Sequence, residues 1–249
     1  MKHPEILVLL FSFGFFLGCS HSGKHTFEEI NCYPDNELGT IYTSCTKFVY
    51  EVKFWDHDYD LISESRAQLF ITGLVNTAMN GQRQVEGIYQ YEYFESDINR
   101  VAPFNINKTM EDTSWVDRAT QALMETPADV WITPFRHNQF KFTQVSPYPS
   151  VNLPLELGKQ WTSNLVMYDG WGDWDNQQLI SNYQVIGQEA LDLPFETLAG
   201  TWHVKATVST NLGVNELDFW FHESYGFVKM IYRNYGGQLL QFELTEVAT

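Results

Sequence analysis

Two short segments combine closely spaced carboxylates with aromatic side chains, and these residue types are the ones in the chain best suited to binding a ligand or a metal ion. One is Trp55–Asp60, with the sequence WDHDYD, and the other spans 169–176, with the sequence DGWGDWDN. Carboxylates on a glycine-containing loop can gather oxygen ligands for calcium, and a Trp beside an Asp can stack on a sugar ring and hydrogen-bond its hydroxyls. The candidate ligand loop consists of Asp169, Trp171, Asp173, Trp174 and Asp175. We prefer the alternative of polar hairpin turns whose aromatic ends pack on the sheet, with one Trp ring of the second segment buried and one partly exposed.

Signatures of catalysis are absent elsewhere in the sequence. There is no Gly-x-Ser-x-Gly, no His-Glu-x-x-His and no phosphate-binding loop. Histidines such as His57, His137 and His203 are scattered, and a general base needs a positioned partner. The sequence therefore predicts a protein that is not an enzyme, with no catalytic residues, cofactor or metal. The alternative is a glycan-acting enzyme that uses a pair of carboxylates from the two acidic loops.

Composition and charge exclude one class of partner. The 249 residues contain 15 Lys and Arg against 31 Asp and Glu, which gives a net charge of −16. Nucleic-acid binding needs a basic face, so we expect no nucleic-acid partner. Anionic lipids would also repel this surface, so membrane attachment would need an acyl chain.

The N-terminus has the features of an export signal. Lys2 precedes an apolar run from Ile6 to Leu17, and small residues follow at Gly18, Cys19 and Ser20. The run is shorter than the about 20 residues that cross a bilayer as a helix. The segment resembles a bacterial lipoprotein signal, which implies cleavage before Cys19 and acylation of that cysteine. Ser20 at the next position resembles an outer-membrane address. The alternative is cleavage by an ordinary signal peptidase, which would release a soluble periplasmic or secreted protein.

Two further cysteines, Cys32 and Cys45, follow the signal. Export allows a disulfide between them, and closing that loop would stabilise the fold by about 3 kcal/mol in the chain-entropy model. The alternative is two free thiols. Zinc binding is not expected, because no second cysteine pair at zinc spacing accompanies them.

Three regions are predicted: a signal peptide over 1–18, a flexible polar tether over 19–40 and a single β-rich domain over 41–249. Within the domain, residues 47–54 alternate apolar and polar types, as a half-buried strand does. Further strands are expected at 66–75, 85–94, 129–135 and 139–145. One helix is predicted from Glu111 to Thr126, because Trp115, Ala119 and Leu123 recur at helical spacing and Pro127 ends the segment.

The second half reads as a meander, with strands at 159–168, 179–189, 200–210, 214–223, 227–234 and 238–247 separated by short turns. This spacing predicts an all-β fold: a curved antiparallel sheet, in the form of a β-roll or open barrel, with one short helix. Four segments of this half, 151–161, 183–189, 193–202 and 219–229, are similar to the TapB-like group of exported bacterial proteins. That resemblance covers 150–249 and implies a β-roll of unknown function, with no catalytic residues to transfer.

Together these observations predict a non-catalytic, lipid-anchored protein of the outer membrane. Its expected role is that of a binding or structural module of the cell envelope. We expect the inside or the mouth of the curved sheet to hold an apolar ligand, a lipid or a glycan. The sequence identifies no protein partner.

Overall fold

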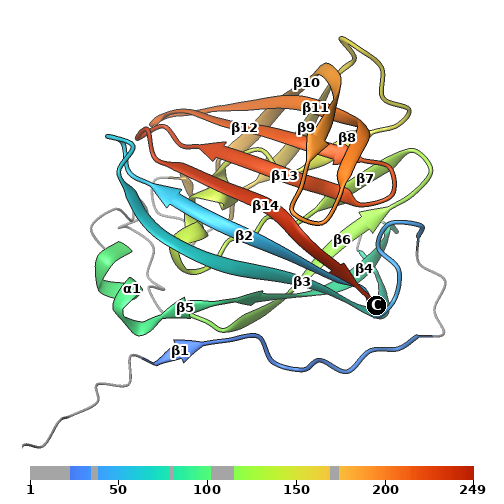
Figure 1. Cartoon of the computed structure of the whole chain (residues 1–249). Coiled ribbons are helices and arrows are strands. Elements are labelled where there is room, and N and C mark those ends of the chain that lie inside the picture. Colours follow the sequence, from blue (N-terminus) through green and yellow to red (C-terminus); the bar gives the residue numbers. More distant parts are fainter. Residues whose placement is uncertain (1–22, 35–38, 79–80, 102–114, 169–173) are drawn as a thin grey trace, which may run out of the picture.

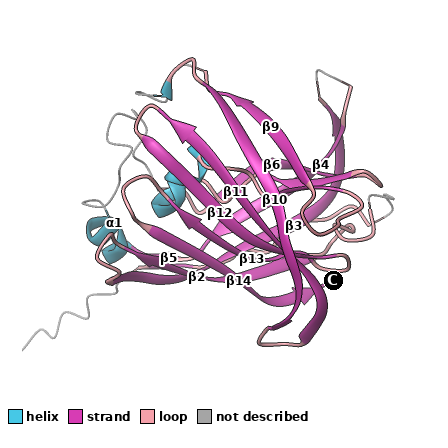
Figure 2. Ribbon diagram, turned by 90° about the horizontal axis from the view of Figure 1, so that it is seen from above, coloured by secondary structure: helices cyan, strands magenta, loops and turns pink. Residues whose placement is uncertain are grey.

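The computed structural model describes residues 23–34, 39–78, 81–101, 115–168 and 174–249. Its main element is a twelve-stranded antiparallel sheet that curls round on itself (Figures 1 and 2). The strand order is β8-β7-β6-β4-β3-β2-β14-β13-β12-β11-β10-β9. The all-β fold with a curved antiparallel sheet, predicted from the sequence, is confirmed.

The strands of this sheet have the following bounds: β2 Lys47–Trp55, β3 Leu61–Thr77, β4 Arg83–Tyr91, β6 Arg118–Glu125, β7 Asp129–Ile132, β8 Ser150–Asn152, β9 Gln160–Val166, β10 Gln178–Asp192, β11 Thr197–Thr210, β12 Gly213–His222, β13 Gly226–Arg233 and β14 Leu239–Ala248. A separate pair joins β1 (Lys24–His25) to β5 (Tyr93–Phe94), and a short helix α1 (Glu95–Val101) follows β5.

Strand β14 joins the two halves of the chain, because it pairs with β13 on one side and with β2 on the other. Along each strand, alternate side chains point into the core, as in β12, where Leu217, Phe219 and Phe221 are buried. The main core cluster takes residues from both halves, from Tyr50 and Tyr89 to Phe219 and Phe242. The two halves of the described chain thus share this main core cluster.

The predicted helix from Glu111 to Thr126 is wrong where the structure describes it. Residues 111–114 lie outside the described residues, and Arg118–Glu125 form strand β6 beside β4. Ala119 and Leu123 are four residues apart, and residues at this spacing share one face of a strand as well as one face of a helix. Their spacing therefore does not distinguish a strand from a helix. The β4 edge offers backbone hydrogen bonds to this segment, and that tertiary pairing overrides the local preference.

The strand predicted at 139–145 is also wrong, because Asn138–Val145 form the 3-10 helix η2. All eight residues are buried. Phe140 packs on Tyr91 of β4 and on Phe242 of β14, with ring centroids 5.7 and 5.4 Å apart. These two residues come from inward faces of the sheet, so η2 lies within the curve of the sheet, where the pictures show a short helix (Figure 2). Phe140 and Phe142 alternate as in a strand, but the segment turns tightly inside the sheet instead of extending along an edge.

The structure differs from the predicted tether over residues 23–34. Strand β1 pairs with β5, the Tyr33 N–H donates to the Thr72 carbonyl at 2.8 Å, and Cys32 is joined to Cys45 by a disulfide. The sequence of this segment is mostly polar and has no sustained alternation of apolar and polar residues. Its attachment to the sheet could therefore not be predicted from the sequence.

The close approach of this segment to β3 requires a glycine. Gly73 has φ +88°, and a Cβ there would overlap the carbonyl oxygen of Tyr33. Gly81, with φ +82°, has open space where its Cβ would lie.

We therefore predict that Gly73→Ala destabilises the domain more than Gly81→Ala. Each substitution places an L-residue in the left-handed region at roughly 1–2 kcal/mol, but only the first also displaces Tyr33, for about 1 kcal/mol more. Urea unfolding of the two variants measures the difference. Equal losses in the free energy of unfolding would contradict the packing of Tyr33 on Gly73.

Candidate functional site

A pocket of about 670 Å³ opens at one end of the curved sheet. Four parts of the chain form it: the segment before β2, the β6–β7 turn, the loop after β8 and the β12–β13 turn. The lining residues are Gly39, Thr40, Ile41, Glu125, Thr126, Pro127, Val130, Leu153, Pro154, Phe221 and Glu223. We call this site the mouth pocket.

Apolar side chains form the floor of the mouth pocket. Ile41, Val130 and Phe221 line it and are also members of the main core cluster, and Leu153 packs against that cluster. The polar lining residues are Thr40, Glu125, Thr126 and Glu223. The pocket therefore offers an apolar surface together with a few hydrogen-bonding groups.

Glu125 holds the wall of the pocket in place. Its Oε1 accepts hydrogen bonds from the backbone N–H and hydroxyl of Thr40, at 2.6 and 2.9 Å, and its Oε2 accepts one from the Tyr42 N–H at 2.9 Å. The Ile41 N–H lies 3.1 Å from both oxygens. A carboxylate bound by consecutive backbone N–H groups is strongly held, because charge-assisted hydrogen bonds are about twice as strong as neutral ones.

The loop after β8 is held by a lysine. Lys159 Nζ donates to the carbonyl oxygens of Asn152 and Pro154, at 2.7 and 2.8 Å. Pro154 and Leu153, which lies between the two contacts, are thereby kept at the pocket wall. Sequence reasoning identified neither Glu125 nor Lys159, because their partners are backbone groups, which leave no signal in residue types.

A second, smaller groove of about 440 Å³ lies on β9, β10 and β11. Its polar lining residues are Gln160, Thr162, Asn182, Gln184, Lys205 and Thr207. Asn182 pairs with Thr162 on one side and with Thr207 on the other, so these side chains form a row across three strands. Amide and hydroxyl groups in a row can bind a polar ligand through several hydrogen bonds.

Tyrosines and one arginine occupy the interior. The hydroxyls of Tyr89 and Tyr232 are buried and have no hydrogen-bond partner among the described residues, and burial raises the pKa of both phenols well above the usual value. Burial also raises the pKa of Tyr183 to about 12. Arg136 donates to Gln144 Oε1 at 2.6 Å and to Gln121 Oε1 at 2.5 Å. Its positive charge opposes the pKa rise of Tyr89, so this cation lies near the phenols.

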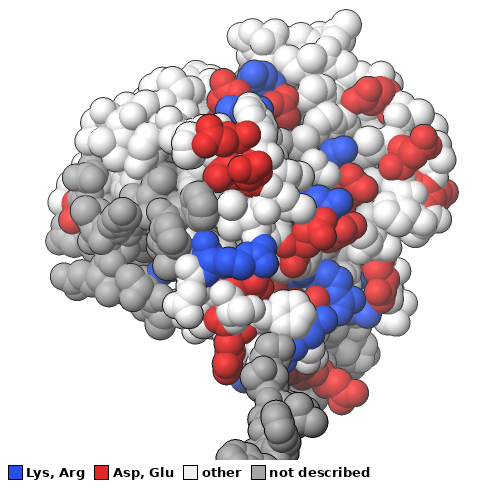
Figure 3. All heavy atoms as spheres, turned by 60° about the vertical axis from the view of Figure 1, so that its left-hand side comes forward, with Lys and Arg blue, Asp and Glu red and all other residues white. Residues whose placement is uncertain are grey.

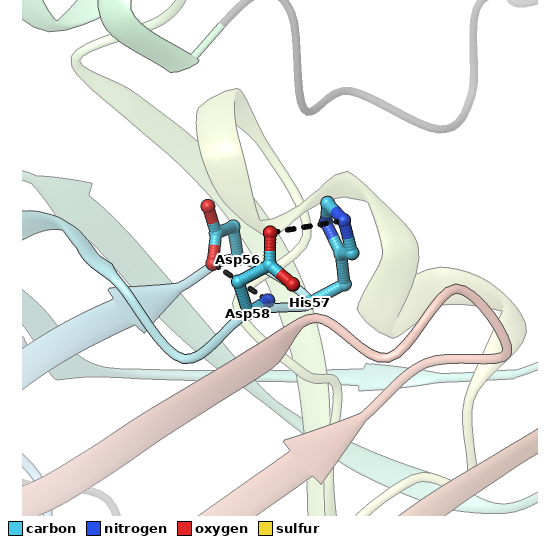
Figure 4. Close-up of side chains that lie close together, drawn as sticks. All are labelled: Asp56, His57 and Asp58. Atoms are coloured by element: carbon cyan, nitrogen blue, oxygen red, sulfur yellow. Dashed lines mark hydrogen bonds and ion pairs between the residues drawn. The ribbon is translucent and has the colours of Figure 1, made fainter.

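The first acidic segment forms the β2–β3 turn, as expected (Figure 4). The buried carboxylate of Asp56 accepts hydrogen bonds from the N–H groups of Asp58 and Asp60, at 2.9 and 3.0 Å. This pattern stabilises a turn without any ligand. One ligand atom each from Asp56, His57 and Asp58 lies within 4.8 Å of the others, so the group has the reach to hold a cation. His57 and Asp58 are exposed, and such clusters are common without an ion.

Only part of the second acidic loop is described. Asp169, Trp171 and Asp173 lie outside the described residues. Trp174 is 1% exposed and packs in a small core cluster with Met167, Leu179 and Val208, whereas Asp175 is exposed. The Trp174 ring is therefore a packing residue, as the preferred interpretation expected of one of the two rings.

The other predicted residues that the structure describes do not line the mouth pocket. Cys19 lies outside the described residues, and Cys32 and Cys45 form their disulfide with Cα atoms 5.3 Å apart. His203 Nε2 lies 2.9 Å from Asp218 Oδ1, and its ring stacks on Trp220 at 4.3 Å. This pair joins neighbouring strands β11 and β12, and no described nucleophile accompanies it in these contacts. None of the predicted loop residues that the structure describes lines the pocket.

Comparisons with known proteins show a distant likeness to solved structures. No family model and no curated protein sequence matches the chain. A protein described as exported, with a YmcC-like fold, from Bacteroides fragilis matches at 9% identity and TM-score 0.48, over 88% of this chain and 100% of its own. A protein described as a lipoprotein from Parabacteroides distasonis matches at 12% identity and TM-score 0.44, over 85% of this chain and 100% of its own.

A third structure, a β-barrel-like domain of unknown function from Brucella abortus, matches at 9% identity and TM-score 0.40, over 85% of this chain and 99% of its own. At these TM-scores the likenesses carry no argument about function. The resemblance to the TapB-like group stays a prediction. Among the residues that the structure describes, no helix is long and apolar enough to span a membrane.

We predict that Glu125→Gln loosens the wall of the mouth pocket. The new amide removes the charge and turns an N–H₂ group toward N–H donors, which should lower the free energy of unfolding by about 1–3 kcal/mol. Amide hydrogen exchange at Thr40, Ile41 and Tyr42 should also become faster. Glu223→Gln, at an exposed position on the same pocket, is the control and should change stability by less than about 0.5 kcal/mol. Unchanged exchange at residues 40–42 in Glu125→Gln would contradict this role.

Proposed function

We propose that this protein is an exported, lipid-anchored binding protein of the bacterial envelope, and that its mouth pocket takes a small apolar ligand with one hydrogen-bonding end. The observation that carries the proposal is the pocket itself. Its volume of about 670 Å³ lies within the about 300–1,000 Å³ of typical small-molecule sites. The floor of the pocket consists of residues of the main core cluster, and a few polar groups line the rest of it. Small-molecule sites usually have this mainly apolar lining with a few polar groups.

The chemistry of the lining favours an apolar ligand over a sugar. The half-buried Leu153 and the exposed Pro127 and Pro154 present apolar carbon to the ligand, above the buried core residues of the floor. Glu223, an exposed polar member of the lining, can accept a hydrogen bond from one polar group of that ligand. The Thr126 hydroxyl is engaged within the β6–β7 turn by Asp129 and Ala128. A glycan would need hydrogen bonds along its whole length, and this floor offers few.

The carboxylates of the pocket favour binding over catalysis. Both oxygens of Glu125 are engaged by residues 40–42, so this group is committed to holding the wall. Glu223 is exposed, and a single carboxylate does not supply the acid and base pair of a glycosidase. We therefore propose that the protein is not an enzyme.

Export is supported by two independent features. The N-terminal segment ending at Cys19 has the pattern of a lipoprotein signal. The Cys32–Cys45 disulfide suits the oxidising compartments outside the cytosol. We propose acylation at Cys19 and residence at the outer membrane, and soluble export is the alternative.

A glycan is the second candidate ligand, at a different place. The groove on β9, β10 and β11 carries a row of amide and hydroxyl side chains, which suits a polar chain lying across the strands. Asn182→Ala with Gln184→Ala would remove the centre of this row and leave the mouth pocket intact. The two ligand classes are therefore separable by mutation.

The proposed function is tested with N-phenyl-1-naphthylamine, a neutral apolar probe whose fluorescence rises on leaving water. We expect saturable binding by the domain. Leu153→Glu should weaken the affinity by about tenfold or more, because it places a charge at the apolar floor. Leu157→Glu, 73% exposed in the same loop, is the matched control and should bind as the wild type does.

Pro127→Trp provides a second variant, because it fills the mouth from an exposed turn and leaves the floor unchanged. Circular dichroism establishes that each variant is folded. The proposal for this pocket would be overturned if the wild type showed no saturable binding. It would also be overturned if folded Leu153→Glu and folded Pro127→Trp both bound the probe as tightly as the wild type does.

A further inference from the structure

The chain that leads to the proposed lipid anchor is held tightly at one end of the sheet. Lys24 pairs with Phe94 and His25 with Tyr93 in the β1–β5 ladder. The His25 ring stacks on Tyr93 at 4.3 Å, and its Nδ1 lies 2.6 Å from Asp117 Oδ1. Lys24 also forms an ion pair with the buried Glu92 at 3.2 Å.

The segment after β1 stays on the domain. The Arg66 guanidinium lies over the Phe27 ring at 5.1 Å, Gln90 Nε2 donates to the Glu28 carbonyl at 3.2 Å, and Arg118 forms an ion pair with the Glu28 carboxylate at 3.2 Å. The disulfide at Cys32 then closes the segment covalently onto the fold. Residues 23–34 thus cannot act as a free spacer.

The spacer that remains is short. Four residues separate Cys19 from Lys24. An extended chain covers at most about 3.5 Å per residue, so Lys24 stays within about 18 Å of the anchor residue. An anchor in a membrane would therefore hold the β1–β5 end of the domain close to the lipid surface.

The strand register shows which other parts lie at this end. Gln90 pairs with Arg118, so the start of β6 lies beside the end of β4 that leads into β5. Following the antiparallel pairs round the sheet, the β2–β3 turn, the β11–β12 turn and the end of β9 lie at the same end. The mouth pocket includes Glu125, at the opposite end of β6.

This end carries most of the exposed large apolar side chains. Of thirteen such residues among those described, eight lie here, and we call them the apolar rim. The apolar rim consists of Tyr59, Leu61, Phe94, Val166, Tyr168, Ile180, Leu212 and Val214. Tyr168 is 74% exposed and Ile180 is 51% exposed. Exposed apolar groups gathered at one end of a protein mark a contact surface.

We propose that the apolar rim and the β1–β5 end rest on the lipid surface that holds the acylated Cys19, and that the mouth pocket points away from it. This inference rests on the proposed lipid anchor and not on ligand binding. Seven residue steps along β6 separate Arg118 from Glu125, which corresponds to about 23 Å at the rise of an antiparallel strand. The ligand then enters the pocket from the aqueous compartment and not from the supporting leaflet.

Charge does not supply this contact. Figure 3, which brings the left-hand side of Figure 1 forward, shows Asp and Glu side chains interspersed with Lys and Arg. Lys24, Arg66 and Arg118 are each paired with an acidic residue. The acyl chains and the apolar rim therefore provide the attraction, and the contact should persist on zwitterionic lipid and at high salt.

The test uses the full-length, lipidated protein in phosphatidylcholine vesicles that contain a doxyl-labelled phosphatidylcholine as a quencher. A fluorescent amino acid is introduced at Leu212 in the apolar rim or at Leu157 beside the mouth pocket, one at a time. Both sites are exposed turns or loops, so neither replacement disturbs the core. We expect quenching several-fold stronger at Leu212 than at Leu157, unchanged by added salt.

Equal quenching at the two sites, or stronger quenching at Leu157, would overturn the proposed orientation. The intact mass of the same sample reports acylation at Cys19, and an unmodified mature chain would overturn both the anchor and the orientation. Binding of N-phenyl-1-naphthylamine, measured on the same vesicles, reports the mouth pocket separately. Failure of the orientation and failure of the proposed ligand site are therefore distinguishable.

Discussion

The need to fill the inside of a twelve-stranded sheet determines much of this structure. About eight strands give an interior that side chains alone can fill, and a wider sheet encloses more space. Here the chain itself enters, with Phe135 stacked on Phe242 at 5.2 Å and η2 following directly. Tyr50 and Tyr89 meet Phe135 edge-on, with ring centroids 5.6 and 4.9 Å away. The centre is thereby occupied, so the space for a ligand lies at the mouth.

The two edges of the sheet impose a second constraint, because unpaired strand edges promote aggregation. The edge strands β8 and β9 are consecutive in the chain, and the connection between them lies along the gap. Gly158 donates to the Val185 carbonyl at 3.0 Å, and the Tyr183 hydroxyl donates to the Tyr148 carbonyl at 2.9 Å. The first contact holds the β8–β9 connection against β10, and the second ties β10 to the chain before β8.

Alternation predicted the strands well where one face is buried, as in β2, β12 and β14. The same pattern failed where the spacing of apolar residues fits both a helix and a strand, and where a segment is buried on all sides. Ala119 and Leu123 fit a helix and a strand equally, and the residues of η2 are buried on every side. The sequence suggested the mouth of the sheet as one place for a ligand, but the residues that form the mouth pocket could not be predicted, because Glu125 binds backbone groups 83 to 85 residues away in the chain. Residue types alone carry no information on such contacts, nor on the pairing of β1 with β5.

Native-state hydrogen exchange of η2 tests most directly whether the chain fills its own barrel. A surface 3-10 turn opens by local fluctuation, whereas a segment inside the sheet is exposed only when the sheet opens. The account predicts that the protected amides within Asn138–Val145, such as Phe140, which donates to the His137 carbonyl at 3.0 Å, exchange as slowly as those of β13 and β14. Exchange at the rate of exposed turns such as 223–225 would contradict it, and would leave the interior open to a ligand.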